Sequence, residues 1–584
     1  MPSRGRGFYL NILRPKRGGV YARLAQSYWD QGHVKTHVIT NFGRVTPAQL
    51  EALRLWVDSN PLSPGPAAKD LILLRLQNLH CHQSWTYGRE ALGHFLWWKL
   101  GLHQIVLEAL NGIDGKARHA RWIEALVLNR LAQPSSKYGS LRWLKVSATP
   151  FLLGLGDTPR HENALYRAMD RLWVRHNGVE TRIWERIVKP LTAHPDIYYH
   201  DLTSTYFERE PDDFVKFGYN RDKVEGCPQV NWGMVVTPEG FPITCQVYPG
   251  NTTDVTTVVG MRERLQSLFG LEGGIYVGDR GMRSGDNVKD LVAHRFHTIL
   301  AEKISEKAPM AILEKAVRQD PIAKTEKLVV REVVGEDARR WIVLLNEKHR
   351  TSELETLEHR RVEGEVILKG WRKRAGDTPH HEILKGCQKE LSQAGLLSLF
   401  EIGFDEYSFQ GLTSEMKAAY ERKKKWAGWW VLSTDTELPA VQVAETYQGL
   451  AIIERGWREI KSVLDVRPVY HTLQRRISAH LAICELAYLV ERYAGWKVRS
   501  AGVMGEEGPL TGPGAFEAMG TMVVNDQEIV GTGVRFKQVT EPNEGQRRIL
   551  ETLGLKVEAF QRGWSGLDPE RIPSKGQGPG IGGA

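Results

Sequence analysis

Residues 196–208 read DIYYHDLTSTYFE, where aromatic and β-branched residues surround the acid Asp201 in a run typical of a buried strand. The segment 230–250, VNWGMVVTPEGFPITCQVYPG, predicts two more strands joined by a TPEG turn. A helix, a strand, a second helix and a further strand are then predicted at 254–270, 273–278, 284–295 and 296–303. Strands that alternate with helices in this way indicate an α/β architecture built on a mixed sheet.

This order of elements is typical of the beginning of a ribonuclease H-like core. The alternation of strands and helices stops after residue 302, and helices resume near residue 438. We therefore expect an insertion that divides the core into two parts. The short basic helices before the core suit either a DNA-binding module or a helical packing domain. We therefore expect an N-terminal β-meander (1–62), a helical DNA-binding region (67–190), the two parts of the core (196–302 and 438–500), a β-rich insertion domain (303–437) and a Gly-rich, partly disordered C-terminal extension (501–584).

Composition excludes several classes of protein. The 584 residues are 41% apolar and 25% charged, which is ordinary for globular chains and too long for one domain. Five scattered cysteines without a CxxC pair argue against a disulfide framework and against a thiolate zinc site. The net charge of +9 is modest and permits a polyanionic partner such as DNA. With no apolar run long enough for a signal peptide or a membrane span, we expect a soluble cytoplasmic protein.

Three carboxylates are placed where a sheet of this kind holds its ligands. Asp201 lies inside the first strand, and Asp279 directly follows the apolar run 275–278, at the carboxyl edge of another strand. Glu454 lies in a late helix. Each acid taken singly also has a structural reading, as a strand-end acid, a turn former before Gly281 or a solvated helix residue. Three acids at three matching places in one fold favour a functional site.

The predicted late helix carries a stripe of polar residues. Tyr447, Glu454 and Lys461 are spaced by seven, so each lies only ~20° around the helix from the one before it. Arg458 lies four residues after Glu454 and on the same side. An acid between a tyrosine and a lysine can present one metal ligand flanked by two phosphate contacts. On its own, such a stripe is more often a solvated helix face.

The spacing of these residues resembles the DDE transposases of bacterial insertion sequences, in the subclass marked by Y-x2-R-x3-E-x6-K. The motif reads Tyr447, Leu450, Glu454 and Lys461, and the segments DLTSTYFE, YPGNTTD, YVGDRGM, RPVYH, VLNRLAQPSSK and LYRAMDRL add to the resemblance. The resemblance covers most of residues 8–500. The wide gap between Asp279 and Glu454 also resembles the spacing in this family. The sequence departs from the motif at Leu450, which takes the position of the arginine. Either Arg458 or Arg455 substitutes for that arginine, or the role is absent.

The resemblance implies a catalytic triad and its cofactor. Asp201, Asp279 and Glu454 would hold two Mg²⁺ ions, with Mn²⁺ as a substitute, for in-line displacement at phosphorus. The implied activity cuts at the ends of an insertion sequence and joins the 3′-OH ends to target DNA. The implied partner is double-stranded DNA, both terminal inverted repeats and target, bound by a homodimer in the synaptic complex on the bacterial nucleoid. Tyr447, Arg458 and Lys461 would contact DNA, whereas Arg467 and His471 either line the DNA channel or pack.

Two other functions stay open at this point. A catalytically decayed or domesticated DNA-binding protein would keep the fold without turnover, and Leu450 and the Gly-rich tail are the features that favour it. A metal-dependent nuclease without strand transfer would release nicked DNA and never join ends. The three intact acids argue against the first alternative, and the sequence does not separate the second from a transposase.

Overall fold

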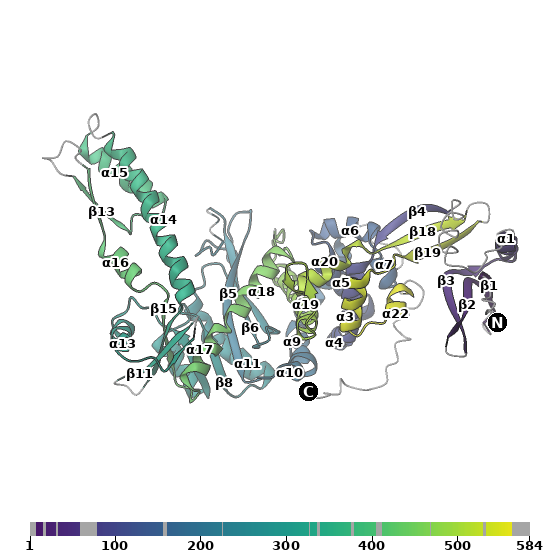
Figure 1. Cartoon of the computed structure of the whole chain (residues 1–584), viewed down its shortest axis with the longest axis horizontal. Coiled ribbons are helices and arrows are strands. Elements are labelled where there is room, and N and C mark those ends of the chain that lie inside the picture. The colour runs from purple at the N-terminus through teal and green to yellow at the C-terminus, as the bar shows by residue number, and fades with distance from the viewer. Residues whose placement is uncertain are drawn as a thin grey trace.

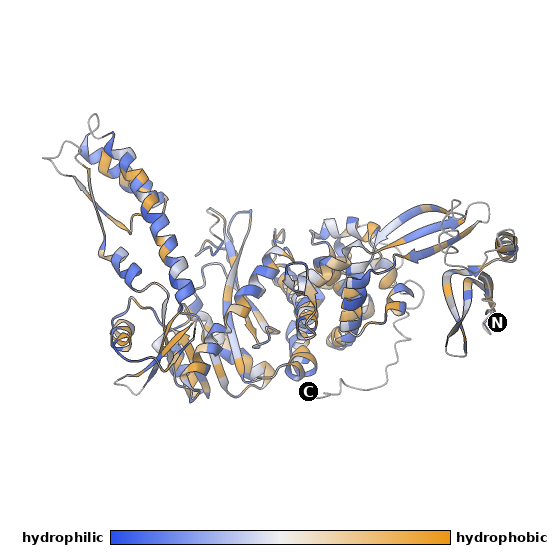
Figure 2. Ribbon diagram, in the orientation of Figure 1, coloured by the Kyte–Doolittle hydropathy of each residue, from blue (hydrophilic) through white to orange (hydrophobic). Residues whose placement is uncertain are grey.

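The computed structural model describes residues 8–562 apart from 16–18, 31–32, 59–78, 156–160, 223, 225, 326–327, 336–338, 375–378, 405–411, 468 and 530–532. Figure 1 shows an elongated molecule with a helical arm at one end, a large sheet beside it, a helical region in the middle and a small β-sheet at the other end. Apolar residues concentrate in the sheet and in the central helices, whereas the arm is largely hydrophilic (Figure 2).

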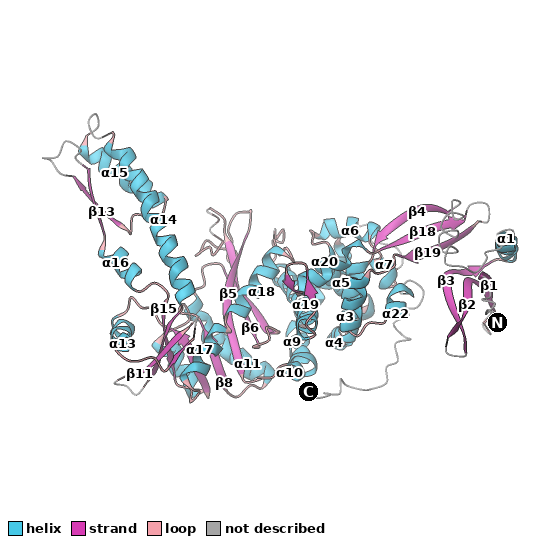
Figure 3. Cartoon of the chain, viewed as in Figure 1, coloured by secondary structure: helices cyan, strands magenta, loops and turns pink. Residues whose placement is uncertain are grey.

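The core is a mixed sheet of nine strands, with helices lying beside it (Figure 3). The strand order is β10-β11-β12-β15-β9-β8-β5-β6-β7, in which β5 pairs parallel with β8 and β8 parallel with β9, while the other pairs are antiparallel. The α/β class with a mixed sheet is therefore confirmed. The strands are β5 (Ile197–Tyr206), β6 (Gln229–Val236), β7 (Pro242–Pro249), β8 (Gly274–Gly278), β9 (Phe296–Ala301), β10 (Ala323–Lys324), β11 (Val329–Val334), β12 (Arg340–Leu345) and β15 (Trp429–Thr434).

Strands β10, β11, β12 and β15 of the 303–437 segment extend this sheet, whereas the strands Phe400–Phe404 and Leu412–Met416 pair with one another, which differs from the single β-rich insertion domain expected. Their apolar residues Val330, Ile342 and Leu432 lie in the main core, and a sequence run cannot show which sheet a strand joins. Between β12 and β15 the chain leaves the sheet as the arm, which has its own small apolar cluster. The arm comprises α14 (Glu347–Arg372), α15 (His380–Gln393), β13 (Phe400–Phe404), β14 (Leu412–Met416) and α16 (Ala418–Lys425).

The central region packs around two helices that are buried along most of their length, α5 (Lys116–Ala132) and α19 (Gln474–Ser500). None of the described helices combines the length and the apolar character that a membrane span needs. The remaining helices are α3 (Gly88–Lys99), α4 (Leu102–Ala109), α6 (Lys137–Val146), α7 (Thr149–Leu152), α8 (Asn163–Val174), α9 (His176–Ile183), η2 (Trp184–Val188), α10 (Lys189–Leu191), η3 (Asp254–Thr257), α11 (Val258–Phe269), α12 (Gly285–Ala293), α13 (Lys307–Val317), α17 (Ala440–Gln448) and α18 (Ala451–Ser462).

The segment 501–562 forms regular elements and packs on the central region, although its glycine content had indicated an irregular extension. Its strand β18 (Val523–Ile529) pairs with β4 (Leu79–Thr86), and the Tyr87 hydroxyl donates to the Phe560 carbonyl at 2.5 Å. The expected disorder of the last residues concerns 563–584, which lie outside the described residues. The other elements here are β16 (Met504–Gly505), β17 (Gly508–Pro509), α20 (Gly512–Ala518), η4 (Met519–Thr521), β19 (Val534–Val539), α21 (Glu544–Thr552) and α22 (Val557–Arg562).

A small antiparallel sheet lies at the N-terminal end of the molecule. It has the order β1-β2-β3, followed by a helix, and its core includes Ile529 and Phe536 from the β18–β19 hairpin. The sheet β1-β2-β3 and the β18–β19 hairpin are therefore packed together. The elements are β1 (Phe8–Leu13), β2 (Val20–Asp30), β3 (His33–Val45) and α1 (Pro47–Asp58).

Candidate active site

The two aspartates lie side by side on neighbouring parallel strands. The register pairs Tyr199 of β5 with Val277 of β8, so Asp201 and Asp279, each two residues further on, stand level with one another. Side chains at the same level of two parallel strands share one face of the sheet. Asp201 lies within β5 and Asp279 directly after β8. The strand order thus brings together two acids that are 78 residues apart in the sequence.

Electrostatic coupling connects these aspartates to the glutamate of α18. Burial, together with the negative charges of Asp279 and Glu454, raises the pKa of Asp201 to about 8. Burial and nearby Asp254 raise the pKa of Asp279 as well. The structure therefore places Glu454, which is exposed to solvent, within electrostatic reach of Asp201. A buried carboxylate whose charge two neighbouring acids disfavour marks a site that a cation stabilises.

Two charged residues at this site escaped the sequence analysis. Asp254, the first residue of η3, forms an ion pair with Arg221. The positive charge of Arg221 also partly offsets the rise in the pKa of Asp201 and of Asp279. The Gly281 amide donates to Asp279 Oδ1 at 2.8 Å, and a Cβ at this glycine would lie 2.9 Å from Asp254 Oδ2. Asp254 belongs to the YPGNTTD segment, which could have drawn attention to it. No sequence signal marked Arg221.

The predicted late helix is divided in two. α17 ends at Gln448 and α18 begins at Ala451, joined by a tighter turn in which the Leu450 amide donates to the Tyr447 carbonyl at 3.0 Å. Gly449 faces the hydroxyl of Tyr199 on β5, and a Cβ there would overlap that oxygen. The Tyr199 hydroxyl also donates to the Thr446 carbonyl at 2.9 Å, which fixes the turn against the sheet. The stripe inferred from one continuous helix is therefore interrupted after Tyr447.

Tyr447 nevertheless remains in the cluster of acids. Burial and the negative charges of Asp279, Glu454 and Asp201 raise its pKa well above the usual value, so its hydroxyl keeps its proton near neutral pH. Leu450, at the arginine position of the motif, is 5% exposed and packs in the main core. Arg458 is exposed, and its charge acts on Glu459. The cation that acts on the two aspartates is Arg221.

A shared carboxylate holds together two of the predicted DNA-contacting residues. Asp222 accepts from Lys461 Nζ at 2.8 Å and from Arg467 Nη1 at 2.9 Å, and the Arg467 guanidinium lies over the ring of Tyr206. The side chains of Lys461, Asp222 and Arg467 are 15%, 16% and 21% exposed. Burial lowers the pKa of Lys461, an effect that Asp222 partly offsets. The lysine of the motif is thus held in position by an acid adjacent to Arg221.

Replacing Asp222 by Asn is expected to destabilise the protein by about 1–3 kcal/mol, because it leaves two partly buried cations without their shared anion. Chemical denaturation of the variant and of wild type measures this difference. Adding Lys461→Met to Asp222→Asn removes one stranded cation and should recover part of the loss. Equal stability of wild type and Asp222→Asn would show that the three side chains are not coupled.

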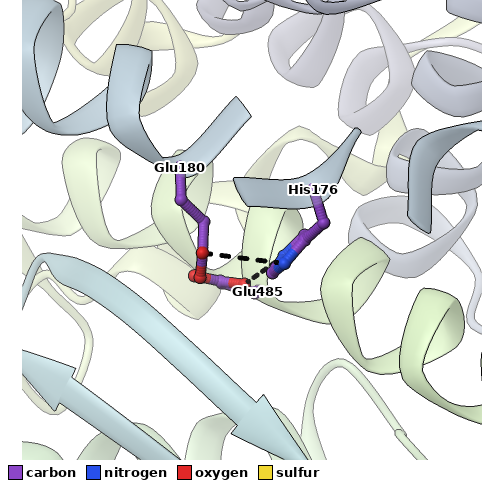
Figure 4. Close-up of side chains that lie close together, drawn as sticks. All are labelled: His176, Glu180 and Glu485. Carbon is purple, nitrogen blue, oxygen red and sulfur yellow. Dashed lines mark hydrogen bonds and ion pairs between the residues drawn. The ribbon is translucent and has the colours of Figure 1, made fainter. Parts of the chain in front are cut away.

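A buried cluster of His176, Glu180 and Glu485 also has the composition of a metal site (Figure 4). Among the described residues, only this group of at least three His, Cys, Asp or Glu side chains brings its ligand atoms within 4.8 Å of one another. However, Glu180 already accepts from the Cys245 amide at 2.8 Å and the Thr244 hydroxyl at 3.0 Å, and it pairs with Arg264.

His176 Nε2 lies 3.2 Å from Glu485 Oε2, and burial alone would lower the pKa of this histidine, but Glu180 and Glu485 together raise it. A histidine that tends to be charged, next to an arginine, balances the two acids. We interpret the cluster as a buried network that joins α9, α19 and β7.

Asp201, Asp279 and Glu454 do not form a ready-made site for one ion, because their ligand atoms do not all lie within 4.8 Å of one another. The donor set consists of carboxylate oxygens, which Mg²⁺ and Mn²⁺ prefer.

His471, the last of the predicted DNA contacts, lies apart from the three acids. It is 7% exposed and lines a cavity beside Arg467, between the central helices and the segment that follows α18.

Comparisons with known proteins assign the core. The family model described as "Transposase DDE domain" matches residues 193–490, just over half of the chain. A solved structure titled as a piggyBac transposase synaptic complex with hairpin DNA is similar over 85% of this chain and 90% of its own, at 9% identity and a TM-score of 0.37. The comparison with curated proteins found no match.

Proposed function

The chain belongs to the family of DDE transposases, and on that premise we propose that it cuts DNA at the ends of an insertion sequence and joins the 3′-OH ends to target DNA. The observation that carries the proposal is the convergence of Asp201, Asp279 and Glu454 from two neighbouring parallel strands and one helix. The order β7-β6-β5-β8-β9 around them supports a ribonuclease H-like core.

The three carboxylates fit a pair of divalent cations. Their oxygens are hard ligands. The raised pKa of Asp201 means that its negative charge is disfavoured at this site, and bound cations would compensate that charge. In this proposal Asp201, Asp279 and Glu454 would together hold the two Mg²⁺ or Mn²⁺ ions. When bound, such ions stabilise the attacking and leaving oxygens of a displacement at phosphorus.

Other side chains of the site orient the DNA. The protonated Tyr447 hydroxyl can donate to a phosphate oxygen, and Lys461, held by Asp222, presents a positive charge on the same side as the acids. Arg221 restrains Asp254 and reduces the repulsion between the two aspartates. In this arrangement Arg221 supplies the positive charge that Leu450 cannot.

The proposed partners follow from this chemistry. The DNA substrate comprises the terminal inverted repeats of the element and the target duplex, and two ends brought together require at least a dimer of the chain. The protein would act on the bacterial nucleoid. The piggyBac neighbour is itself titled as a synaptic complex with hairpin DNA.

The test is a cleavage and joining assay on the DNA that flanks the gene of this protein, in Mg²⁺ and in Mn²⁺. Cuts at the element boundary followed by joined products support a transposase. Nicked ends that never join would assign the metal-dependent nuclease. Specific binding without cuts in either metal would assign the decayed DNA-binding protein.

A further inference from the structure

A cavity of about 380 Å³ lies where the N-terminal helices meet the segment between α18 and α19. Three segments of the sequence meet in it: VLNRLAQPSSK (127–137), LYRAMDRL (165–172) and RPVYH (467–471). Its volume falls in the ~300–1,000 Å³ range of ligand pockets. The residues that matter for its chemistry are Arg130, Lys137, Tyr138, Tyr166, Arg467 and His471.

Arg130 sits in the wall of this cavity with 4% of its surface exposed. Its guanidinium donates to the carbonyl oxygens of Asp465 at 2.9 Å and Leu464 at 3.4 Å, and also to that of Ser135. Backbone carbonyls satisfy hydrogen bonds but carry no net charge. The positive charge of Arg130 is therefore held in place without being neutralised by these contacts.

Lys137 is equally buried, at 4% exposed, and opens the first turn of α6. Its ammonium lies 3.0 Å from His480 Nδ1, and His480 Nε2 lies 3.0 Å from the Val466 carbonyl. A carbonyl accepts only from a protonated Nε2, so Nδ1 is the acceptor for the lysine. His480 is therefore a neutral partner that fixes the position of Lys137, and the positive charge of Lys137 stays uncompensated.

The pKa shifts of His471 and Lys137 are consistent with an excess of positive charge in the cavity. Burial and the charges of Lys137, Arg476 and Arg130 lower the pKa of His471 to about 3. Burial and Arg130 lower the pKa of Lys137 to about 7. Both shifts have the sign that a buried cationic site produces.

The acids nearby do not cancel this charge. Asp170 is shared by Arg475, at 3.0 Å, and Arg476, at 3.2 Å. Asp465 lines the cavity and its charge acts on Arg130, but its side chain is exposed to solvent, which screens that charge. Asp222 is already shared by Lys461 and Arg467. The N-terminal turn of α6, which has Ser136 as its cap, adds the positive end of a helix dipole.

We propose that this cavity binds a phosphate group of the DNA backbone, held by Lys137, Arg130 and Arg467, with the adjoining nucleotide against the tyrosine rings at its rim. Tyr138 and Tyr470 line the cavity and are 60% and 69% exposed. The Arg142 guanidinium lies over the Tyr138 ring, 4.9 Å from its centroid, so Tyr470 is the ring better placed for stacking. Arg467 also pairs with Asp222, which holds Lys461 of the active site. A strand bound in the cavity therefore leads from the N-terminal helices to the acids.

The assignment of the phosphate to DNA rests on the proposed function, whereas the inference that the cavity binds an anion does not. Its test is binding, measured on the full-length protein with inorganic phosphate and with duplex DNA of the element end. Lys137→Met keeps the volume of the side chain and removes the charge. Lys145→Met is the matched control, because Lys145 lies on the same helix but is exposed and does not line the cavity.

We expect Lys137→Met to weaken phosphate binding at least tenfold and to lower the slope of DNA affinity against salt concentration by about one. Lys145→Met should leave phosphate binding unchanged. Equal phosphate affinity in wild type and Lys137→Met would overturn the site. A loss for phosphate with unchanged DNA affinity and salt slope would overturn DNA as the source and assign a free phosphate ligand. These outcomes do not depend on whether the protein cuts DNA.

A pH series with sulfate, whose charge is constant above about pH 4, gives a second readout. Between pH 7 and pH 9 the sulfate affinity of wild type should fall by up to tenfold per pH unit, because binding requires Lys137 to be protonated. His471 and His480, with lowered pKa values, and Cys484, with a raised one, stay neutral in this range. The other charged groups that face Lys137 and His471 are Arg130, Arg476, Asp465 and Asp170. A pH profile as steep in Lys137→Met as in wild type would contradict the assignment.

Discussion

Glu454→Gln is expected to lower DNA strand cleavage at least about 10³-fold while leaving DNA binding nearly unchanged. The substitution keeps the shape of the side chain and removes the negative charge that the proposed site uses to bind a divalent cation. Glu454 is exposed, so the loss of its charge should not disturb folding. Cleavage is measured on labelled element ends in Mg²⁺, and binding on the same DNA in the absence of divalent metal.

Asp201→Asn and Asp279→Asn should show the same separation of binding from cleavage, because Asp279 and Glu454 both act on the charge of Asp201. Glu445→Gln is the matched control, since Glu445 is exposed on the adjoining helix α17 and should retain full activity. Cleavage that persists in any of the three variants would remove that residue from the proposed catalytic set.

Gly449→Ala should have the second largest effect, on both stability and cleavage. The added methyl would overlap the Tyr199 hydroxyl, so the turn between α17 and α18 must move away from β5. Overpacking of this kind costs about 1–3 kcal/mol, and a shift of about 1 Å in the position of Glu454 can reduce cleavage about 10²-fold. Thermal unfolding and the cleavage assay measure the two effects.

Two further substitutions test the cause of this effect. Tyr199→Phe removes the oxygen that the methyl would meet, so the double variant should regain part of the stability and activity lost in Gly449→Ala. Gly260→Ala in α11 is the control, because a Cβ there meets nothing within 4 Å and alanine favours a helix. A double variant no better than Gly449→Ala would show that the Tyr199 hydroxyl is not the obstacle.

The sequence predicted the centre of the molecule well because the information there is local. The succession of strands and helices from residue 196 indicated a mixed sheet, and the positions of Asp201 and Asp279 relative to two apolar runs placed both acids on it. Strand periodicity also implies that residues at one level of adjacent strands face the same way. The assignment of the three acids to catalysis stays a prediction.

What the sequence did not predict depends on contacts between distant residues. The break between α17 and α18 arises from the contact of Gly449 with Tyr199, 250 residues earlier, which no helical periodicity can reveal. The partnerships of Arg221 with Asp254 and of Asp222 with Lys461 are likewise long-range. A β-rich insertion was expected at 303–437, but the place of β11, β12 and β15 in the main sheet is set by the pairing of β15 with β9.

The order in which the three acids leave the ribosome has a consequence for the cell. Asp201 and Asp279 are 78 residues apart, and Glu454 follows 175 residues later, beyond the arm. At ~5–20 residues per second, Glu454 is synthesised roughly 9–35 s after Asp279. The partner strand of β4, residues 523–529, comes later still. A message that breaks off before residue 454 therefore yields a polypeptide without the third acid, and under the proposed function such a fragment would not cut DNA.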